Sequence, residues 1–375
     1  MFAIRARRLF DGVETYHDRT VIVEDGRIAA VGPGIAPTVD LGDVTLLPGL
    51  IDCHVHLAFD AGPDPIGALE RPGLAGRMRE AARRHLAAGE TTVRDLGDRD
   101  YLALGLDLGT DGPEILAAGP PITPPKGHCW FLGGEAEGEH EVREAVRTRA
   151  ERGVHVIKMM VTGGEMTPGT HSHQPQYGPA ELKAAADEAH AYGLPITGHS
   201  HCARGTALAL DAGFDSIEHC SFFTEESVEV DHGLIDRLAA SGVAISLTAG
   251  MVPTDVPPPP PILRRIPGIV ESLRAVYAAG ATFVIGTDAG IGPPKPHGLL
   301  PWGAQMLVDQ GYEAVDVLRA ATSVAARVCR VGDRKGRIAP GYDADLLAVE
   351  GDPLADMAAL RRPVAVYRMG RQCVP

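Results

Sequence analysis

The chain has 375 residues, of which 45% are hydrophobic, and its formal net charge is −14. This length exceeds one core of ordinary size and fits a large α/β domain with a small companion domain. The negative charge disfavours nucleic acid and anionic membranes as partners. Six cysteines are scattered without CxxC spacing, which is typical of neither a disulfide framework nor a zinc finger.

The N-terminal stretch MFAIRARRLFDG contains arginines, but no apolar run follows them. We therefore do not expect a secretory signal. No run of about 18 apolar residues occurs in the sequence, so no membrane span is predicted. Together these features predict a cytoplasmic protein.

Both ends of the chain are rich in predicted strands. The stretch TVIVEDGRIAAVG near the N-terminus is typical of a hairpin, with Asp25 and Gly26 as its turn. The C-terminal stretches GRIAPGYDADLLAVEG and PVAVYRMGRQCV have a similar pattern. We predict that residues 1–49 and 331–375 pair into one small β-sandwich domain.

Between these ends, apolar runs alternate with Ala-rich helical stretches. The helix GPAELKAAADEAHAYG is the clearest, with Pro179 in its first turn, Gly193 at its end, and Leu182, Ala186, Ala189 and Tyr192 on about one face. The apolar runs are GLIDCHVHL, TTVRDLG, EILAAG, VHVIKMM, LPITGHS, FDSIEHC, VAISLTAG and TFVIGTD. Eight strands in this alternation predict an α/β fold, with residues 50–330 closed as a (β/α)8 TIM barrel. The proline-rich stretch from Val256 to Gly268 is predicted to be a stiff loop over the barrel mouth.

Polar residues recur where these predicted strands end. In a parallel barrel such ends meet at one face, where these folds keep their active sites. Strand alternation puts His54 and His56 on the same side of the first strand. Neutral imidazole and carboxylate are the usual ligands of zinc and related metals. The sequence therefore predicts a metal centre built from strand-end residues: His54, His56, Lys158, His199, His219 and Asp288.

Lys158 lies in the middle of an apolar strand, in a chain that has five lysines and thirty arginines. A buried ammonium is costly unless it is paired or neutralised, and lysine loses its proton on burial more readily than arginine. Either Lys158 reaches solvent from the end of the strand, or its amine takes part in the chemistry.

The stretches PGLIDCHVHL, IKMMVTGG, GHSH, SIEHC, GTDAG and RIAPGYDADLLAVEGDPL resemble the amidohydrolase superfamily. The resemblance covers almost the whole chain and is closest to the prolidase-like and imidazolonepropionase-like branch. It implies two divalent metal ions, with zinc as the expected metal. His54, His56 and Asp288 would bind the more buried ion, and His199 and His219 the more exposed one. Lys158, carboxylated by CO2 to N6-carboxylysine, would bridge them.

The same resemblance favours His199 over His201 as the ligand from GHSH. It also predicts a metal-dependent amidohydrolase that cleaves a C–N amide bond of an N-acyl amino acid or dipeptide-like substrate. A metal-bridging hydroxide would attack, with Asp288 as general base and then acid. His128, in PPKGHCW, matches a family histidine near the substrate carbonyl and would also act in catalysis.

Further substrate contacts are expected at the same mouth. The hydroxyl of Tyr177 could hydrogen bond to a substrate carboxylate, and Arg264 and Arg265 could bind it by charge. The cluster HSHQ, residues 171–174, is predicted to face solvent. The substrate is expected to be a small molecule, and the family resemblance implies a homo-oligomer.

Three other functions were weighed against this one. A cyclic-amide hydrolase of the imidazolonepropionase type would keep one metal and lack the bridging lysine, so Lys158 argues against it. A deaminase would need a Glu near the strand-five histidine, and GHSHCARG contains none. A non-catalytic binding protein on the same fold would be expected to have lost ligands, and none is missing. The sequences ISLTAG and GHSHCARG depart from the family pattern beside the substrate, so the usual peptide or cyclic-amide substrate is in doubt.

Overall fold

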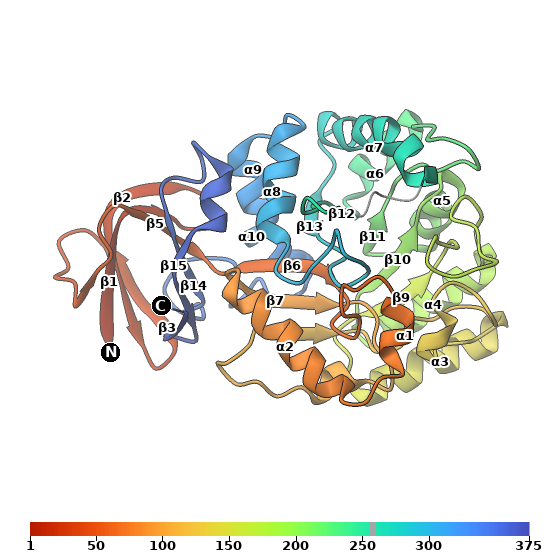
Figure 1. The fold of residues 1–375 in the computed structure, drawn as a ribbon, viewed down its shortest axis with the longest axis horizontal. Coiled ribbons are helices and arrows are strands. Elements are labelled where there is room, and N and C mark those ends of the chain that lie inside the picture. Colours follow the sequence, from red (N-terminus) through yellow and green to blue (C-terminus); the bar gives the residue numbers. More distant parts are fainter. Residues whose placement is uncertain (256–259, 375) are drawn as a thin grey trace.

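The structure is a computed structural model that describes residues 1–255 and 260–374. A sheet formed by the two ends of the chain lies beside a larger part in which strands and helices alternate (Figure 1). Among the described residues, every helix is too short or too polar to cross a membrane. The six cysteines are free thiols, and those of Cys53 and Cys329 lie 3.7 Å apart.

The two ends of the chain share one eight-stranded mixed sheet. Its strand order is β16-β15-β14-β5-β1-β2-β3, and β4 pairs with β1. The antiparallel pairing of β5 with β14, with Leu47 opposite Leu347, joins the two ends. The predicted pairing of the two ends of the chain is therefore confirmed. In the described residues their strands form one hydrogen-bonded sheet, and the two layers of the predicted sandwich are not shown. The strands are β1 (Phe2–Phe10), β2 (Thr15–Glu24), β3 (Arg27–Gly32), β4 (Val39–Asp40), β5 (Val44–Pro48), β14 (Leu346–Glu350), β15 (Pro363–Arg368) and β16 (Arg371–Val374).

The predicted hairpin in this sheet is confirmed. Strands β2 and β3 are antiparallel, and Glu24 lies opposite Arg27. Asp25 and Gly26 form the turn with φ angles of 47° and 78°. Both angles lie in the left-handed region, which Asp tolerates and Gly adopts freely.

Each of the eight predicted apolar runs forms a strand of the central region. They make two parallel sheets, β6-β7-β8 and β13-β12-β11-β10-β9. Isolated parallel bridges, Val55 with Ala289 and Ile122 with Met159, connect the edges of these sheets. This confirms an α/β fold. The strands are β6 (Leu50–Val55), β7 (Glu90–Asp95), β8 (Glu114–Ala117), β9 (Ile157–Met160), β10 (Ile196–Ser200), β11 (Ser216–His219), β12 (Ala244–Thr248) and β13 (Phe283–Gly286).

Helices cover these strands on the outside (Figure 1), and apolar side chains between the two layers form the largest core cluster. The helices are α1 (Pro65–Leu69), α2 (Leu74–Ala87), α3 (Gly138–Arg152), α4 (Pro179–Ala191), α5 (Ala203–Ala212), α6 (His232–Ser241), α7 (Pro260–Ala278), α8 (Leu300–Asp309), α9 (Ala314–Ala320) and α10 (Ser323–Val328). Short 3-10 helices are η1 (Leu102–Gly105), η2 (Trp130–Leu132) and η3 (Met357–Arg361).

The predicted helix around residues 179–191 is α4. Leu182, Ala186 and Ala189 are buried on its inner face, but Tyr192, just after its end, is 47% exposed. Tyr192 therefore does not share one face with the three buried residues, contrary to the prediction from the sequence. The helical periodicity no longer applies there, because α4 ends at Ala191.

The proline-rich stretch was wrongly predicted as a loop over most of its length. Residues 256–259 lie outside the described residues, but α7 begins at Pro260 and continues through Pro267 to Ala278. A proline in the first turn loses no helical hydrogen bond. Arg265, Ser272 and Val276 are buried at helical spacing, so packing along this face keeps Pro267 within the helix.

Candidate metal centre

The ends of β6 and β13 bring three predicted ligands together. The Nε2 atoms of His54 and His56 are 3.2 Å apart. Oδ1 of Asp288 lies 3.5 Å from the first and 3.3 Å from the second. Ligand atoms about 2.1 Å from a tetrahedral metal are about 3.4 Å apart. These three atoms therefore fit around one divalent ion.

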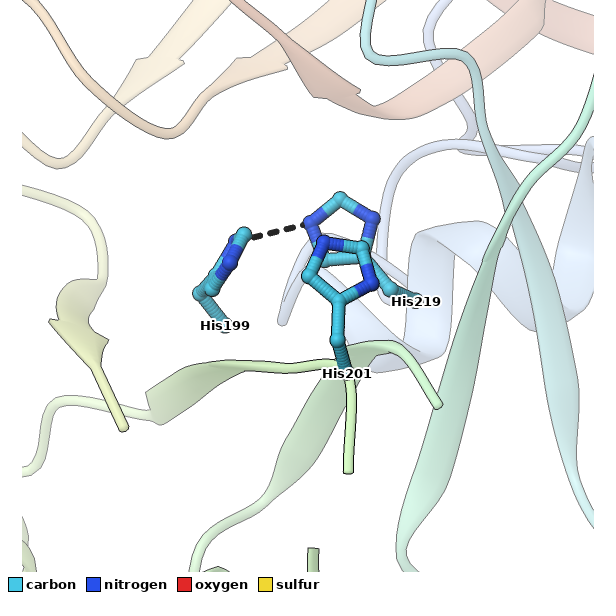
Figure 2. A group of neighbouring side chains, drawn as sticks. All are labelled: His199, His201 and His219. Carbon is cyan, nitrogen blue, oxygen red and sulfur yellow. Dashed lines mark hydrogen bonds between the residues drawn. The ribbon is translucent and has the colours of Figure 1, made fainter. Parts of the chain in front are cut away.

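The ends of β10 and β11 hold a second group of histidines. Nδ1 of His199 lies 2.9 Å from Nε2 of His219, and a dashed line marks this contact in Figure 2. His201 lies across His219, with ring centroids 4.2 Å apart. Ligand atoms from all three residues lie within 4.8 Å of one another. The structure therefore brings both histidines of GHSH to the site, and His201 can serve beside His199.

Lys158 on β9 is buried, and its charge acts on His54 of one group and His199 of the other. It is 1% exposed, and its Nζ atom has no hydrogen-bond partner among the described residues. Burial lowers the pKa of this amine to about 8, although the charges of Glu218 and Asp288 raise it. An unpaired buried amine that gives up its proton easily fits a residue that is modified or bound to a further group.

Glu218 on β11 lies against the ring of His54. Its Oε2 atom lies 2.9 Å from Nδ1 of His54, while its Oε1 atom accepts hydrogen bonds from Arg94 Nη2 at 2.9 Å and Thr197 Oγ1 at 2.6 Å. Burial would raise the pKa of Glu218, but the charge of Arg94 and the contact with His54 hold it well below its usual value. Sequence reasoning missed Arg94, although an arginine inside the apolar run TTVRDLG was a signal of a buried partner.

A backbone irregularity lets the side chains of Glu218 and His219 both point into the interior of the central region. Neighbours in a regular strand point to opposite faces. His219 has a φ angle of 71°, in the left-handed region that is costly for a residue with a Cβ atom. Its ring then points toward His199, and its Nδ1 atom lies 3.1 Å from Thr248 Oγ1. Asp288, with φ of 59°, carries the same kind of strain.

Three of the predicted histidine ligands are neutral imidazoles, whereas for the fourth, His56, burial is outweighed by the contact with Asp288, which raises its pKa. Burial, together with the charge of Lys158, lowers the pKa of His54 to about 4. Burial and neighbouring histidines lower the pKa values of His199 and His219 well below their usual range. Burial would raise the pKa of Asp288, but His54 and His56 keep it ionised. Neutral imidazoles and a carboxylate are suitable ligands for two divalent ions.

His128 lies beside this centre, in the loop after β8. It is 5% exposed, and its ring centroid is 4.7 Å from that of His199. Its Nδ1 atom has no hydrogen-bond partner in the described chain. Burial, with the charge of His201, lowers the pKa of its ring to about 3, so this imidazole is neutral beside the candidate ligands.

Tyr177 does not lie at the site in the predicted way. It is 4% exposed and part of the main core. Its hydroxyl donates to the carbonyl of Ala136 at 2.8 Å, so this placement does not support the predicted contact with a substrate carboxylate. The hydrophobic ring explains why the residue is buried.

Arg265 is also held by the protein. It is 4% exposed and donates to the carboxylate of Glu165 at 2.7 Å and to the carbonyls of Thr224 and Glu225. Its guanidinium lies 4.5 Å from the centre of the Phe223 ring, which stacks on His201 at 4.9 Å. Arg265 thus packs against Phe223, the ring that stacks on His201. Arg264 is exposed. In HSHQ, His171 and Gln174 are exposed as predicted, but Ser172 is buried and donates to Glu165.

A third polar group, which the sequence did not reveal, lies between β6, β7 and α2. It consists of Asp52, His85 and Glu90, with Nδ1 of His297 3.1 Å from Nε2 of His85. Glu90 accepts from the backbone of Leu300, and Asp52 accepts from Thr287 Oγ1. Each side chain has partners, so we interpret this group as structural.

A centre of neutral imidazoles and a carboxylate around a buried lysine is typical of metal-dependent hydrolases. Residues 45–373 match the amidohydrolase family, and the chain belongs to that family. It is 29% identical over 365 residues to ochratoxinase of Aspergillus niger, covering 86% of this chain and 73% of that one. It is 26% identical over 399 residues to imidazolonepropionase of Cereibacter sphaeroides, and the match covers 95% of this chain and 94% of that one.

A solved structure supports the same branch. The crystal structure of a Xaa-Pro dipeptidase with bound methionine in the active site is similar with a TM-score of 0.85. The two sequences are 26% identical, and the match covers 99% of this chain and 98% of that one. These similarities confirm the predicted superfamily and its prolidase-like and imidazolonepropionase-like branch, and they make the chain a metal-dependent hydrolase.

Proposed function

We propose that this protein is a binuclear metal-dependent hydrolase that cleaves a C–N amide bond of an N-acyl amino acid or dipeptide-like substrate. The observation that carries the proposal is the buried, unpaired Nζ atom of Lys158 on β9, together with two groups of candidate ligand atoms at the ends of other strands of the same region. In this proposal His54, His56 and Asp288 hold one ion, and His199 and His219 hold the other. His201 is a further candidate at the second ion.

Lys158 would connect the two groups as N6-carboxylysine. Its neutral amine would form an N–C bond with CO2 and release one proton, which turns the amine into a carbamate anion. The low pKa of this lysine supplies the neutral amine. Arginine could not take its place, because its guanidinium keeps its proton.

Two divalent ions, proposed to be zinc, would supply Lewis acidity and lower the pKa of water to near neutrality. The chain supplies the proton transfers and the positioning. Asp288 would accept a proton from the attacking water and then give it to the leaving nitrogen. His128 would donate a hydrogen bond to the substrate carbonyl oxygen, because its imidazole is neutral and lies beside His199. Arg94 and Glu218 would keep His54 in place.

The relatives favour a dipeptide-like or acyl amino acid substrate without naming one. The similar solved structure is that of a Xaa-Pro dipeptidase, and the similarity to imidazolonepropionase keeps a cyclic-amide hydrolase as the alternative. Lys158 favours the dipeptidase-like reaction, because a cyclic-amide hydrolase is expected to use one metal. A non-catalytic binding protein remains a further alternative that activity measurements can exclude.

We also propose that the eight parallel strands close into a (β/α)8 TIM barrel over residues 50–330, with residues 1–49 and 331–375 as the small β domain. The bridges Val55–Ala289 and Ile122–Met159, which connect the two parallel sheets, support this closure. The predicted sandwich form of the small domain, the homo-oligomer and the cytoplasmic location remain predictions.

The reaction can be tested by incubating zinc-loaded protein with N-acyl amino acids and dipeptides and measuring the released amino acid. Turnover by the wild type is expected, and Asp288→Asn should lower kcat by about 10² to 10⁴. The exposed Asp236 offers a matched control, since Asp236→Asn should keep full activity. Cleavage of cyclic amides alone would favour the alternative reaction, and metal binding without turnover on either panel would favour a binding protein.

A further inference from the structure

Lys295 lies where the strands that carry the metal site end. It belongs to the loop between β13 and α8, and its Nζ atom donates to the carbonyl of Thr287 at 2.7 Å and to that of Thr248 at 3.1 Å. Thr287 immediately precedes Asp288, and the hydroxyl of Thr248 contacts the ring of His219. The ammonium therefore bridges the ends of β12 and β13 beside both proposed metal groups.

The surroundings of Lys295 differ from those of a structural buried lysine in the same chain. Lys335 is buried against three carboxylates, those of Glu114, Asp343 and Asp345. Lys295 is only partly exposed, yet the described residues form no ion pair with it within 4.0 Å. Its known partners are the two neutral carbonyls.

With these two partners, the ammonium of Lys295 can still bind a further acceptor. An ammonium has three N–H donors and no acceptor, so two carbonyls leave one donor and the whole positive charge. A cation removed from water without an anionic partner is costly. Burial lowers the pKa of Lys295 and the charge of Asp288 raises it, so the ammonium lies within electrostatic reach of the proposed general base.

Of the three other groups predicted for a substrate carboxylate, Arg264 is exposed, and Arg265 and Tyr177 are engaged elsewhere. Arg265 is paired with Glu165, and the hydroxyl of Tyr177 donates to Ala136. In an N-acyl amino acid, one carbon separates the amide nitrogen from the carboxylate. A carboxylate at Lys295 would thus leave the scissile nitrogen on the side of Asp288, which must protonate it.

We propose that Lys295 binds the free carboxylate of the substrate by a charge-assisted hydrogen bond. This inference rests on the proposed function and deepens it, because it selects substrates with a free carboxylate over neutral amides. Lys295 is then the specificity-determining residue of the site.

The test measures binding without turnover. The probe is 3-benzoylpropionate, which has CH2 in place of the amide nitrogen of an N-benzoyl amino acid and therefore offers no C–N bond to cleave. Its neutral counterpart is 3-benzoylpropionamide. Calorimetric titration of both into zinc-loaded wild type, Lys295→Met and Lys295→Arg gives the affinities, after equal metal content has been verified. The exposed Lys183, paired with Asp187 on α4, gives the control Lys183→Met.

The wild type should bind the acid more tightly than the amide. Lys295→Met should weaken acid binding about tenfold or more and leave amide binding within about twofold, while Lys295→Arg should recover part of the loss. Equal weakening of acid and amide would show a structural role and overturn the proposal. It would also be overturned if the wild type did not prefer the acid, or if Lys295→Met bound it normally. Failure of the proposed reaction would appear separately, as missing turnover on the amide panel.

Discussion

Nδ1 of His54 lies 2.9 Å from Oε2 of Glu218, although the two residues come from strands on different sheets of the central region. The carboxylate lies against the ring without hydrogen-bond geometry, and the other ring nitrogen, Nε2, faces His56 and Asp288. A carboxylate next to a metal-binding histidine sets its tautomer and raises its basicity. Glu218 is thus a positioning residue for the proposed metal centre.

Replacing Glu218 by Gln should weaken zinc binding about 10- to 100-fold, the usual effect of removing such a partner. The amide keeps a similar shape but removes the anion that faces both His54 and Arg94. Competition with a zinc-binding dye measures the affinity. Glu226 on an exposed turn provides the control Glu226→Gln, and unchanged zinc affinity in Glu218→Gln would contradict the assigned role.

Tyr177→Phe should affect stability rather than substrate binding. The change removes the hydroxyl that donates to the carbonyl of Ala136 and leaves a buried acceptor without its partner. The free energy of unfolding should fall by about 1–2 kcal/mol, as measured by urea denaturation, while KM stays the same. A several-fold rise in KM without loss of stability would instead support the original prediction of a substrate contact.

The ion pairs around Glu114 predict a dependence of stability on pH. Glu114 on β8 contacts Arg334, Lys335 and Arg368 of the C-terminal segment. Burial would raise its pKa, but the hydrogen bond from Arg334 and the nearby positive charges lower it to about 2 from an ordinary value of 4.5. Because the folded-state pKa is depressed, the stabilisation is present above about pH 4.5 and is lost as the pH falls toward 2.

Glu114→Gln should therefore lower the free energy of unfolding near neutral pH, and its difference from the wild type should shrink below pH 4.5. Denaturation at a series of pH values measures this difference. Glu80→Gln, at a side chain that is 57% exposed, should change little at any pH. A difference for Glu114→Gln that grows toward pH 3 would contradict the depressed pKa.

The sequence predicted the strands and most of the candidate ligands, for a physical reason. Apolar runs that end in His, Lys or Asp mark parallel strands whose carboxyl ends meet, and alternation alone placed His54 and His56 together. Each of the eight apolar runs is a strand in the structure. The ligand roles themselves stay predictions, although the distances between their donor atoms fit them.

What the sequence could not predict depends on local backbone geometry and on partners far along the chain. The left-handed φ of His219 lets Glu218 and His219 face the same interior, which strict alternation would forbid. The hydrogen bond from Tyr177 to Ala136 spans 41 residues, and the carbonyls that hold Lys295 come from two other strand ends. Prolines suggested a loop where the buried face of α7 sustains a helix.

The central claim is that Lys158 joins two metal ions, and the most direct test is the metal content per chain of protein prepared with zinc and bicarbonate. The wild type and the control Lys183→Ala should each contain about two zinc ions. Lys158→Ala, with its fold verified by circular dichroism, should retain one or fewer. One zinc ion per chain in all three proteins would contradict the bridged centre and return Lys158 to a structural role.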